Sequence, residues 1–310
     1  MFNILVNTTL PIFSIILLGL ILKRRNFIDA PFIKTANQLV YKVAIPVTIF
    51  REIGEASFRA NFNLAAVFGT LAAMMMVVVV SILTSRLAKI SHNRRGTFLH
   101  SSFHGNIAYM AFAVAFYSLG ESHFASMAIL SGFVILGQNL LAVWVLSVYG
   151  TLNTSGEGGG SLFKRVVSNP IIISVVLGIA FSLSGMSMPV TVRKGLDILS
   201  GMAFPTALLL IGASLSFGAF RVMKKELAGI GFFKLMALPL LGYLFMALFQ
   251  VPQSLVLPGL ILLAAPPATI TYVMAVEMGG HPELAATSIS VLTLLSAVSY
   301  SLILAAFAVG

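Results

Sequence analysis

Long apolar stretches alternate with short polar segments along the whole chain. Membrane helices need about 20 mostly apolar residues, and hydropathy predicts ten such candidate spans. The third contains an uncharged run over residues 64–83 that an ordinary soluble domain would not hold. The pattern therefore predicts an all-α polytopic membrane protein. The ten predicted spans are residues 6–22, 34–50, 61–84, 97–118, 123–149, 169–186, 196–217, 229–249, 255–277 and 283–309.

Composition agrees with this class and narrows the partners. Hydrophobic residues make up 58% of the 310 positions and charged residues only 9%, whereas soluble domains hold about a quarter charged residues. The absence of cysteine excludes disulfides and thiolate metal sites. The net charge of +10 is spread in short Lys/Arg clusters between apolar spans, so we expect a lipid bilayer and no nucleic acid as partner.

The basic clusters also predict an orientation. If the N-terminus lies outside, 13 Lys and Arg residues fall in inside loops and only four, Arg51, Arg59, Arg193 and Lys194, fall in outside loops. Ten spans then place both termini outside the cytoplasmic (cell) membrane. The Gly/Ser-rich loop 151–168 becomes a cytoplasmic linker between the two halves of the chain.

The two halves align at an offset of 159 residues. The segment "LPIFSIILLGLIL" lies over "NPIIISVVLGIAF", which pairs Gly19 with Gly178, and the same register pairs Pro46 with Pro205. Each half would hold five spans, and an odd number makes the halves insert with opposite orientation. We therefore predict two inverted five-helix repeats. Their bounds are residues 1–150 and 169–310.

Two predicted spans are interrupted near their middle. The ninth carries Pro266-Pro267, and the fourth carries Gly105-Asn106 at the related position. Proline costs about 3 kcal/mol or more inside a helix, and non-helical backbone at membrane depth is tolerated only inside protein or beside a watery cavity. We expect the two broken helices to cross and to satisfy each other's freed backbone groups. The alternative interpretation is a pair of kinks packed against neighbouring helices.

The crossing would create a site for an anion. Pro267 suits the first turn of one half-helix, and Asn106 can cap the other. Two half-helix N-termini would then converge with unpaired N–H groups and partial positive charge. The predicted substrate-binding residues are Gly105, Asn106, Tyr109, Pro266, Pro267, Thr269, Thr271, Tyr272 and Lys42.

Other ionisable residues inside the apolar spans refine this picture. Lys42 and Lys234 could attract an anion or extend to the membrane surface, and the position of Lys234 near its span end favours the second interpretation. His100 and His104 lie one turn apart without a third ligand, so we predict no metal site, and a role of His104 in proton coupling stays open. No Asp or Glu falls at mid-span, which favours an anion over a cation as substrate.

No nucleophile elbow, phosphate-binding loop or zinc-protease motif occurs, so we predict no enzyme, no catalytic residues and no cofactor. The sequence favours a carrier, either secondary active or driven by the membrane potential, for a small organic anion. Sodium-coupled symport is the alternative within transport, with proton or sodium as coupling ion, and a non-transporting membrane receptor is a further alternative.

Four segments resemble the auxin efflux carrier family, whose bacterial members transport organic anions such as malate or malonate. They are "LVYKVAIPVTIF" (39–50), "GNIAY" (105–109), "KLMALPLLGYL" (234–244) and "LAAPPATITYVMAVEMGGHPELAATSISVLTLLS" (263–296). The resemblance implies a ten-helix fold similar to bile-acid symporters, a scaffold of spans 1, 2, 6 and 7, and a transport domain of spans 3–5 and 8–10. It also implies elevator-type alternating access, a carboxylate substrate and a homodimer.

The chain departs from the family pattern after the asparagine motif. Members of the family often have a glycine and then a proline there, whereas this chain has Ala111 and Ala113. We therefore expect the fourth span to be less sharply broken than the ninth.

Overall fold

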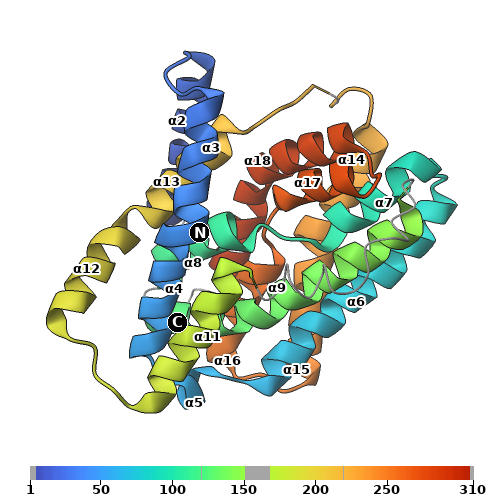
Figure 1. Cartoon of the computed structure of the whole chain (residues 1–310). Coiled ribbons are helices and arrows are strands. Elements are labelled where there is room, and N and C mark those ends of the chain that lie inside the picture. The colour runs from blue at the N-terminus through green and yellow to red at the C-terminus, as the bar shows by residue number, and fades with distance from the viewer. Residues whose placement is uncertain (1–4, 120, 151–167, 219, 308–310) are drawn as a thin grey trace.

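The computed structural model describes residues 5–119, 121–150, 168–218 and 220–307, and these residues form helices joined by short turns (Figure 1). Five-residue and six-residue π-helical segments are labelled η. The first half contains η1 (Leu5–Thr9), α2 (Leu10–Arg24), α3 (Ala30–Leu39), η2 (Val40–Ala44), α4 (Ile45–Glu55), α5 (Phe58–Asn61), α6 (Leu64–Leu87), α7 (His92–Phe103), η3 (Ile107–Ala111), α8 (Phe112–Leu119) and α9 (Glu121–Tyr149). The second half contains α11 (Pro170–Ser184), α12 (Val190–Gly201), α13 (Ala203–Ala213), α14 (Lys224–Gly231), η4 (Phe232–Ala237), α15 (Leu238–Leu248), α16 (Gln253–Leu263), α17 (Ile270–Glu277) and α18 (Pro282–Phe307). The predicted linker 151–168 lies outside the described residues except for Ser168.

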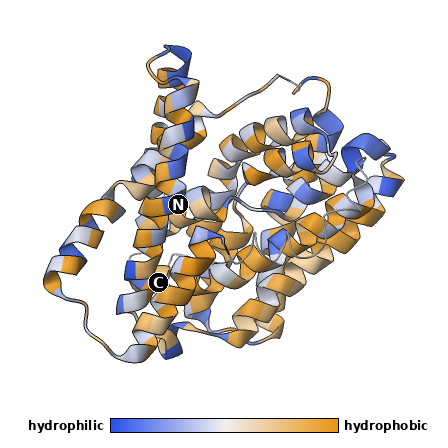
Figure 2. Ribbon diagram, in the orientation of Figure 1, coloured by the Kyte–Doolittle hydropathy of each residue, from blue (hydrophilic) through white to orange (hydrophobic). Residues whose placement is uncertain are grey.

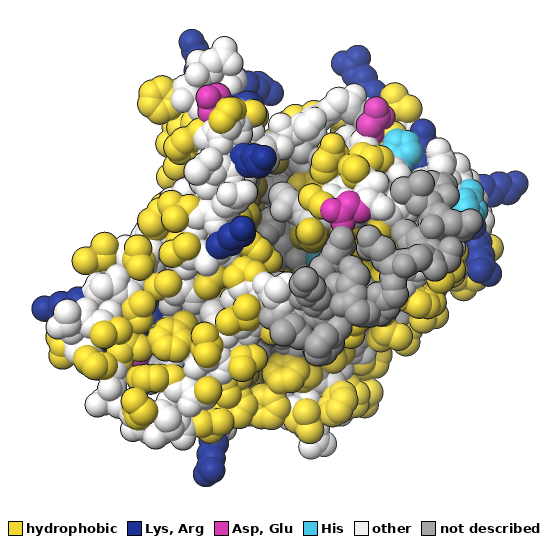
Figure 3. All heavy atoms as spheres, viewed as in Figure 1, with side chains coloured by type: hydrophobic (Ala, Val, Ile, Leu, Met, Phe, Trp, Pro, Cys, Tyr) yellow, Lys and Arg dark blue, Asp and Glu magenta, His cyan; other side chains and the backbone are white. Residues whose placement is uncertain are grey.

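Six helices among the described residues are long and apolar enough to cross a membrane. They are Asn7–Arg24, Leu64–Leu87, His123–Tyr149, Val190–Ala213, Lys224–Leu248 and Pro282–Phe307. The helix bodies are hydrophobic, while hydrophilic residues gather at the turn between α2 and α3 and at the tips of α7 and α14 (Figure 2). Lys and Arg side chains gather at the same ends, and apolar side chains cover much of the face in view (Figure 3). The all-α membrane class is thus confirmed, and the remaining four spans stay a prediction.

Polar side chains fix where several helices begin. The carboxylate of Asp29 accepts the Phe32 N–H at 2.8 Å before α3, and Asn63 accepts the Ala66 N–H at 2.9 Å before α6. Asn169 accepts the Ile171 N–H at 2.9 Å, and Pro170 follows it at the first position of α11. Each cap satisfies an N–H group that has no partner within its helix.

Two glycines allow close packing between helices that are distant in sequence. A Cβ on Gly19 of α2 would overlap the carbonyl of Leu209 in α13, and a Cβ on Gly178 of α11 would lie 2.9 Å from Ile53 and 3.3 Å from the Phe50 oxygen in α4. The offset that relates the two glycines, 159 residues, also relates Phe50 to Leu209. These two glycines thus make close contacts at positions related by the same offset, and the inverted repeat stays a prediction.

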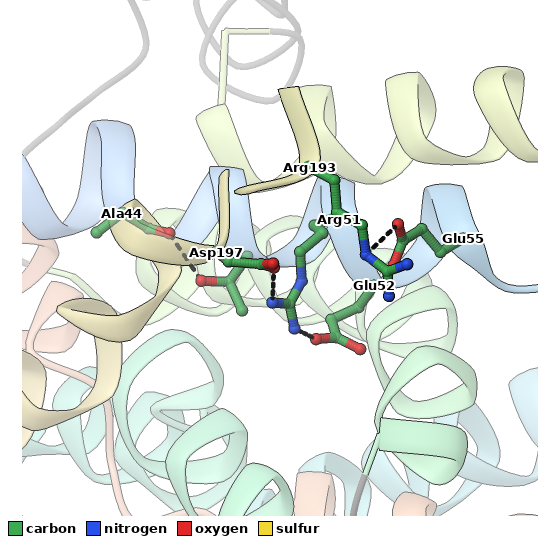
Figure 4. Close-up of polar contacts among 7 residues, drawn as sticks. Ala44, Arg51, Glu52, Glu55, Arg193 and Asp197 are labelled. Carbon is green, nitrogen blue, oxygen red and sulfur yellow. Dashed lines mark hydrogen bonds and ion pairs between the residues drawn. The ribbon is translucent and has the colours of Figure 1, made fainter. Parts of the chain in front are cut away.

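Ion pairs join α4 to α12 at one end of the molecule. Arg51 pairs with its neighbour Glu52 and with Asp197 of α12, and Arg193 of α12 pairs with Glu55 at 3.1 Å (Figure 4). Two of the four cations assigned to outside loops are therefore neutralised by local carboxylates. α12 is the outermost helix on its side of the molecule, where these pairs supplement its packing (Figure 1).

The helices fall into two groups. Group one contains α2, α3, η2, α4, α11, α12 and α13; group two contains α6 to α9 with η3 and α14 to α18 with η4 (Figure 1). In group one α2 packs on α13 and α4 packs on α11, while in group two α6 packs on α15 and α7 packs on α9 and α18. α9 and η3 also contact helices of group one, so they lie at the boundary between the groups.

The glycine contact predicts a stability difference between two alanine variants. Gly19→Ala should lower the melting temperature of the purified protein, because the added methyl overlaps backbone atoms that cannot rotate away, and such overpacking costs about 1–3 kcal/mol. Gly195→Ala in α12 is the control, because no atom lies within 4 Å of its added Cβ. The melting temperature of the control should be unchanged or higher than that of the wild-type protein, since alanine stabilises a helix by roughly 0.5–1 kcal/mol relative to glycine. Equal melting temperatures for the two variants would contradict the close helix contact.

Candidate functional site

The fourth and ninth predicted spans are both interrupted at the predicted positions. Residues 104–106 leave the helix between α7 and η3, and residues 264–269 do so between α16 and α17. The interruption in the fourth span is the shorter one, as expected from Ala111 and Ala113. Its π-helical segment η3 takes up part of the distortion before α8 continues the span.

The two interruptions contact each other through an antiparallel backbone bridge between Gly105 and Pro267. The Asn106 N–H donates to the Pro266 oxygen at 2.8 Å, and the Ala268 N–H donates to the His104 oxygen at 3.2 Å. In this type of pair the two opposed residues exchange no hydrogen bond with each other. The N–H that Pro267 lacks is therefore not needed. The expectation that the two breaks satisfy each other's backbone is confirmed.

Gln138 of α9 completes the hydrogen bonding of Gly105. Its Oε1 accepts the Gly105 N–H at 3.1 Å, and its Nε2 donates to the Gly105 oxygen at 3.3 Å. The side chain is 4% exposed, so these bonds replace water in the protein interior. Gln138 is absent from the predicted site residues. The adjacent polar residues Gln138 and Asn139 within the apolar span 123–149 were the available signal.

Lys234 of η4 donates a hydrogen bond at the start of the other interruption, where α16 ends. Its Nζ donates to the Leu263 oxygen at 2.7 Å, and the residue is 1% exposed. Leu263 is the last residue of α16, where carbonyl groups lack partners and carry partial negative charge. The interpretation that Lys234 extends to the membrane surface is therefore wrong. A Cβ on Gly105 would lie 3.1 Å from this amine, which explains why glycine suits the position.

The prediction for Asn106 is confirmed and the prediction for Pro267 is wrong. The Asn106 side chain accepts the Tyr109 N–H at 3.3 Å at the start of η3, so the predicted cap is confirmed. Pro267 does not occupy the first turn of the following half-helix, because α17 begins only at Ile270. Pro267 instead lies in the extended segment that pairs with Gly105, where its fixed backbone suits an extended conformation.

A cavity of about 750 Å³ adjoins the bridge. Six predicted site residues line it: Lys42, Gly105, Asn106, Tyr109, Thr269 and Tyr272. Pro266, Pro267 and Thr271 do not line it; the prolines belong to the buried backbone contact, and Thr271 is fully buried. The sequence prediction missed several polar lining residues: Asn37, Gln38, Tyr41, Gln138, Asn139, Asn169, Ser214 and Ser216.

Side chains from both helix groups meet at this cavity. The Tyr109 hydroxyl donates to the Asn37 oxygen at 3.3 Å, which joins η3 to α3. The Tyr41 hydroxyl donates to Asn169 Oδ1 at 3.4 Å on the group-one side. The cavity therefore lies at the boundary of the two groups, with the helix interruptions forming its group-two wall.

The lining favours a negatively charged ligand. Among the described residues the lining contains no Asp or Glu, whereas the exposed residue Lys42 contributes an ammonium group. The backbone N–H groups of Ala108, Thr269 and Ile270 make no hydrogen bond to other described residues, and all three residues line the cavity. They lie at the starts of η3 and α17, where unpaired N–H groups and the helix dipole favour an anion.

Two buried histidines lie beside this lining. His104 lines the cavity, and its Nδ1 is 2.9 Å from Nε2 of His100 on the preceding turn of α7. Within the described residues no group of three His, Cys, Asp or Glu side chains could hold a metal ion.

Comparison with known proteins finds relatives that match most of the chain. A protein of Rhizobium meliloti named "Putative malonate transporter" is 26% identical over 93% of this chain and 91% of its own length. An "Uncharacterized transporter" of Methanothermobacter thermautotrophicus is 26% identical over 95% of this chain and 96% of its own length. Another of Methanocaldococcus jannaschii is 24% identical over 68% of each chain.

The family described as "Membrane transport protein" matches residues 4–304. The likeness to auxin efflux carriers, which rested on the segments around Asn106 and Pro266-Pro267, is confirmed by this match. The chain therefore belongs to the membrane transport protein family and is a membrane transporter rather than an enzyme.

Proposed function

We propose that the protein is a secondary carrier that moves a small organic anion, a carboxylate, across the cytoplasmic membrane. The observation that carries this proposal is the cavity at the two helix interruptions, lined by unpaired N–H groups and Lys42 and by no carboxylate side chain. Its volume of about 750 Å³ lies within the usual range for small-molecule sites, roughly 300–1,000 Å³. The relative named for malonate transport makes malonate the first substrate to test.

The chemistry of the lining suits one carboxylate group at the interruptions. The oxygens of a carboxylate could accept the N–H groups of Thr269 and Ile270 on one side and of Ala108 on the other. Asn106 also lines the cavity, and its side chain caps η3 by accepting the Tyr109 N–H. Lys42 lines the cavity from η2 of group one, where it would attract a second carboxylate of a dianion. A dicarboxylate therefore fits better than a monocarboxylate.

The position of the cavity supports elevator-type alternating access. The interruptions belong to group two. On the group-one side of the cavity, Lys42 lies in η2, Asn169 directly precedes α11 and Ser214 directly follows α13. Sliding group two along group one would carry the anion-binding backbone with it. In this proposal group one is the scaffold and group two the transport domain, in ten spans arranged as two inverted repeats. The close helix contacts at Gly19 (α2 on α13) and Gly178 (α11 on α4) both lie within group one, as expected of a rigid scaffold.

The proposed function is tested by counterflow of labelled malonate in liposomes. Protein-containing liposomes loaded with unlabelled malonate should accumulate labelled malonate. A membrane receptor that binds without transport would bind malonate in detergent and show no exchange. That result would contradict the carrier assignment.

Asn106→Leu should abolish counterflow while leaving the protein folded. The substitution keeps the branching at Cγ but removes the amide that caps η3 and lines the cavity, and the lost cap costs about 1 kcal/mol. Exchange should fall to the level of liposomes without protein, with the melting temperature lowered by only a few degrees. Asn93→Leu, at an exposed position of α7, is the matched control and should exchange normally. Unchanged counterflow in Asn106→Leu would refute the site.

Lys42→Gln should weaken the binding of dianions more than that of monoanions. Removal of a charge–charge interaction of about 1 kcal/mol at a partly solvated site raises the half-saturating malonate concentration roughly five-fold. The measurement is the concentration dependence of counterflow for malonate and for a monocarboxylate of similar size. An equal effect on both substrates would show that Lys42 does not face the second carboxylate.

Replacing sodium by choline should leave malonate exchange unchanged. The cavity lining offers no carboxylate to help hold a sodium ion against the positive charge of Lys42. The assay is uptake at constant ionic strength and fixed membrane potential. A flux that requires sodium would favour the sodium-coupled symporter over the present proposal.

A further inference from the structure

Two hydrogen-bonded histidines lie at the cavity, and the anion site described above assigns them no role. His104 is 1% exposed and lines the cavity, while His100 is fully buried one turn earlier on α7. Their rings meet at 74° with centroids 4.8 Å apart, and His100 Nε2 lies 2.9 Å from His104 Nδ1. The main-chain oxygen of His104 also accepts the Ala268 N–H, so this residue belongs to both the bridge and the pair.

The pair can store a proton. A hydrogen bond between two neutral imidazoles requires that one nitrogen donates and the other accepts. The remaining nitrogen of the inner ring, His100 Nδ1, is buried without a hydrogen-bond partner among the described residues. An added proton therefore has a basic nitrogen to bind, and the short N–H···N contact lets both rings share the resulting charge.

The buried amine of Lys234 on η4 lies close to the pair and opposes an added positive charge on His104; a Cβ on the adjacent Gly105 would lie 3.1 Å from it. Glu226 of α14, a helix that packs against α7, pairs with Arg94 at 2.8 Å. The elements packed against α7 carry these further ionisable residues: Arg86 on α6, His123 and Tyr149 on α9, Lys224 and Lys225 on α14, Tyr272 and Glu277 on α17, and Glu283 and Tyr300 on α18.

Charge balance links the pair to the cavity. An extra proton beside a buried ammonium is unfavourable while the cavity holds no negative charge, since buried charges need a counter-charge. A carboxylate at Asn106 and Thr269 supplies that counter-charge next to His104. Lys234 cannot replace the pair in this role, because its amine does not line the cavity and donates to the Leu263 oxygen.

We propose that the His100–His104 pair takes up one proton when an organic anion enters the cavity, so that the carrier moves the anion together with a proton. The inference rests on the proposed function. In this step a proton from water binds an imidazole nitrogen as the anion binds, and the same proton returns to water when the anion leaves on the other side. A dianion would then cross with one net negative charge.

Proton uptake is measured by titration calorimetry of malonate binding to the purified full-length protein in buffers of different ionisation enthalpy. Linkage predicts uptake of about one proton per malonate bound by the wild-type protein near neutral pH. His100→Gln and His104→Gln keep a side chain that can hydrogen-bond but cannot take up a proton, so their uptake should fall to near zero. His92→Gln is the control on the same helix, and this exposed histidine should leave the uptake unchanged.

Transport in liposomes supplies the second readout. An inward proton gradient should accelerate malonate uptake by the wild-type protein and by His92→Gln. His100→Gln should retain malonate counterflow without a gradient and lose the acceleration.

Three results would overturn the proposal. The first is malonate binding without proton uptake in the wild-type protein, which needs no variant to fold. The second is full proton uptake in both His100→Gln and His104→Gln. The third is uptake that disappears only in Lys234→Gln, which would assign the proton to the amine. Absence of counterflow in the wild-type protein would instead overturn the proposed function, and this proposal with it.

Discussion

Every backbone N–H and C=O group at membrane depth needs a hydrogen-bond partner, and this requirement shapes the centre of the molecule. A continuous helix meets it internally, whereas the chain interrupts two helices at residues 104–106 and 264–269. The bridge between Gly105 and Pro267 supplies two of the missing bonds. Gln138 supplies two more, and Lys234 satisfies the oxygen of Leu263. The interruptions are tolerated because they pair with each other and because α9 and η4 complete their hydrogen bonding.

The groups left over from this pairing define the chemistry of the cavity. The N–H groups of Ala108, Thr269 and Ile270 have no partner among the described residues, and these groups are donors only. Together with Lys42, and with no carboxylate among the described lining residues, they would favour a negatively charged ligand. Lys234 and the two histidines add basic groups behind the bridge. The same backbone requirement that holds the interruptions together thus also prepares the site for an anion.

The apolar helices and the two interruptions could be predicted from the sequence because these features follow from local signals. The contact between the interruptions was inferred from the backbone groups that both breaks leave unpaired. Apolar runs mark the helices, and Pro266-Pro267 and Gly105-Asn106 mark the breaks. The prediction that Pro267 lies in the first turn of a half-helix was wrong, because Pro267 pairs with Gly105 in an extended conformation. Such pairing between distant segments leaves no local signal in the sequence. The prediction for Lys234 was wrong for a related reason. Its place near the start of the span suggested that its side chain reaches the membrane surface, whereas a hydrogen bond to the main-chain oxygen of Leu263 in α16 holds it in the interior.

The polar wall of the cavity was the least predictable part. Asn37, Tyr41 and Asn169 come from group one, and only the packing of that group against the interruptions brings them to the site. No motif in the sequence connects these three residues with the two interruptions. Gln138 stood in the middle of an apolar span and could have been found from its polarity alone. Glycines 19 and 178 carried a repeat signal whose physical meaning, close contact with a backbone oxygen, became visible only in three dimensions.

We propose that an organic anion binds where the two interrupted helices meet. An experimental structure of the protein in a lipid disc with saturating malonate would locate the anion. We expect density for the anion in the cavity, within hydrogen-bond distance of the main-chain nitrogens of Ala108 and Thr269, with the bridge between Gly105 and Pro267 intact. Anion density away from both interruptions, or separated interruptions with uninterrupted helices in their place, would contradict it.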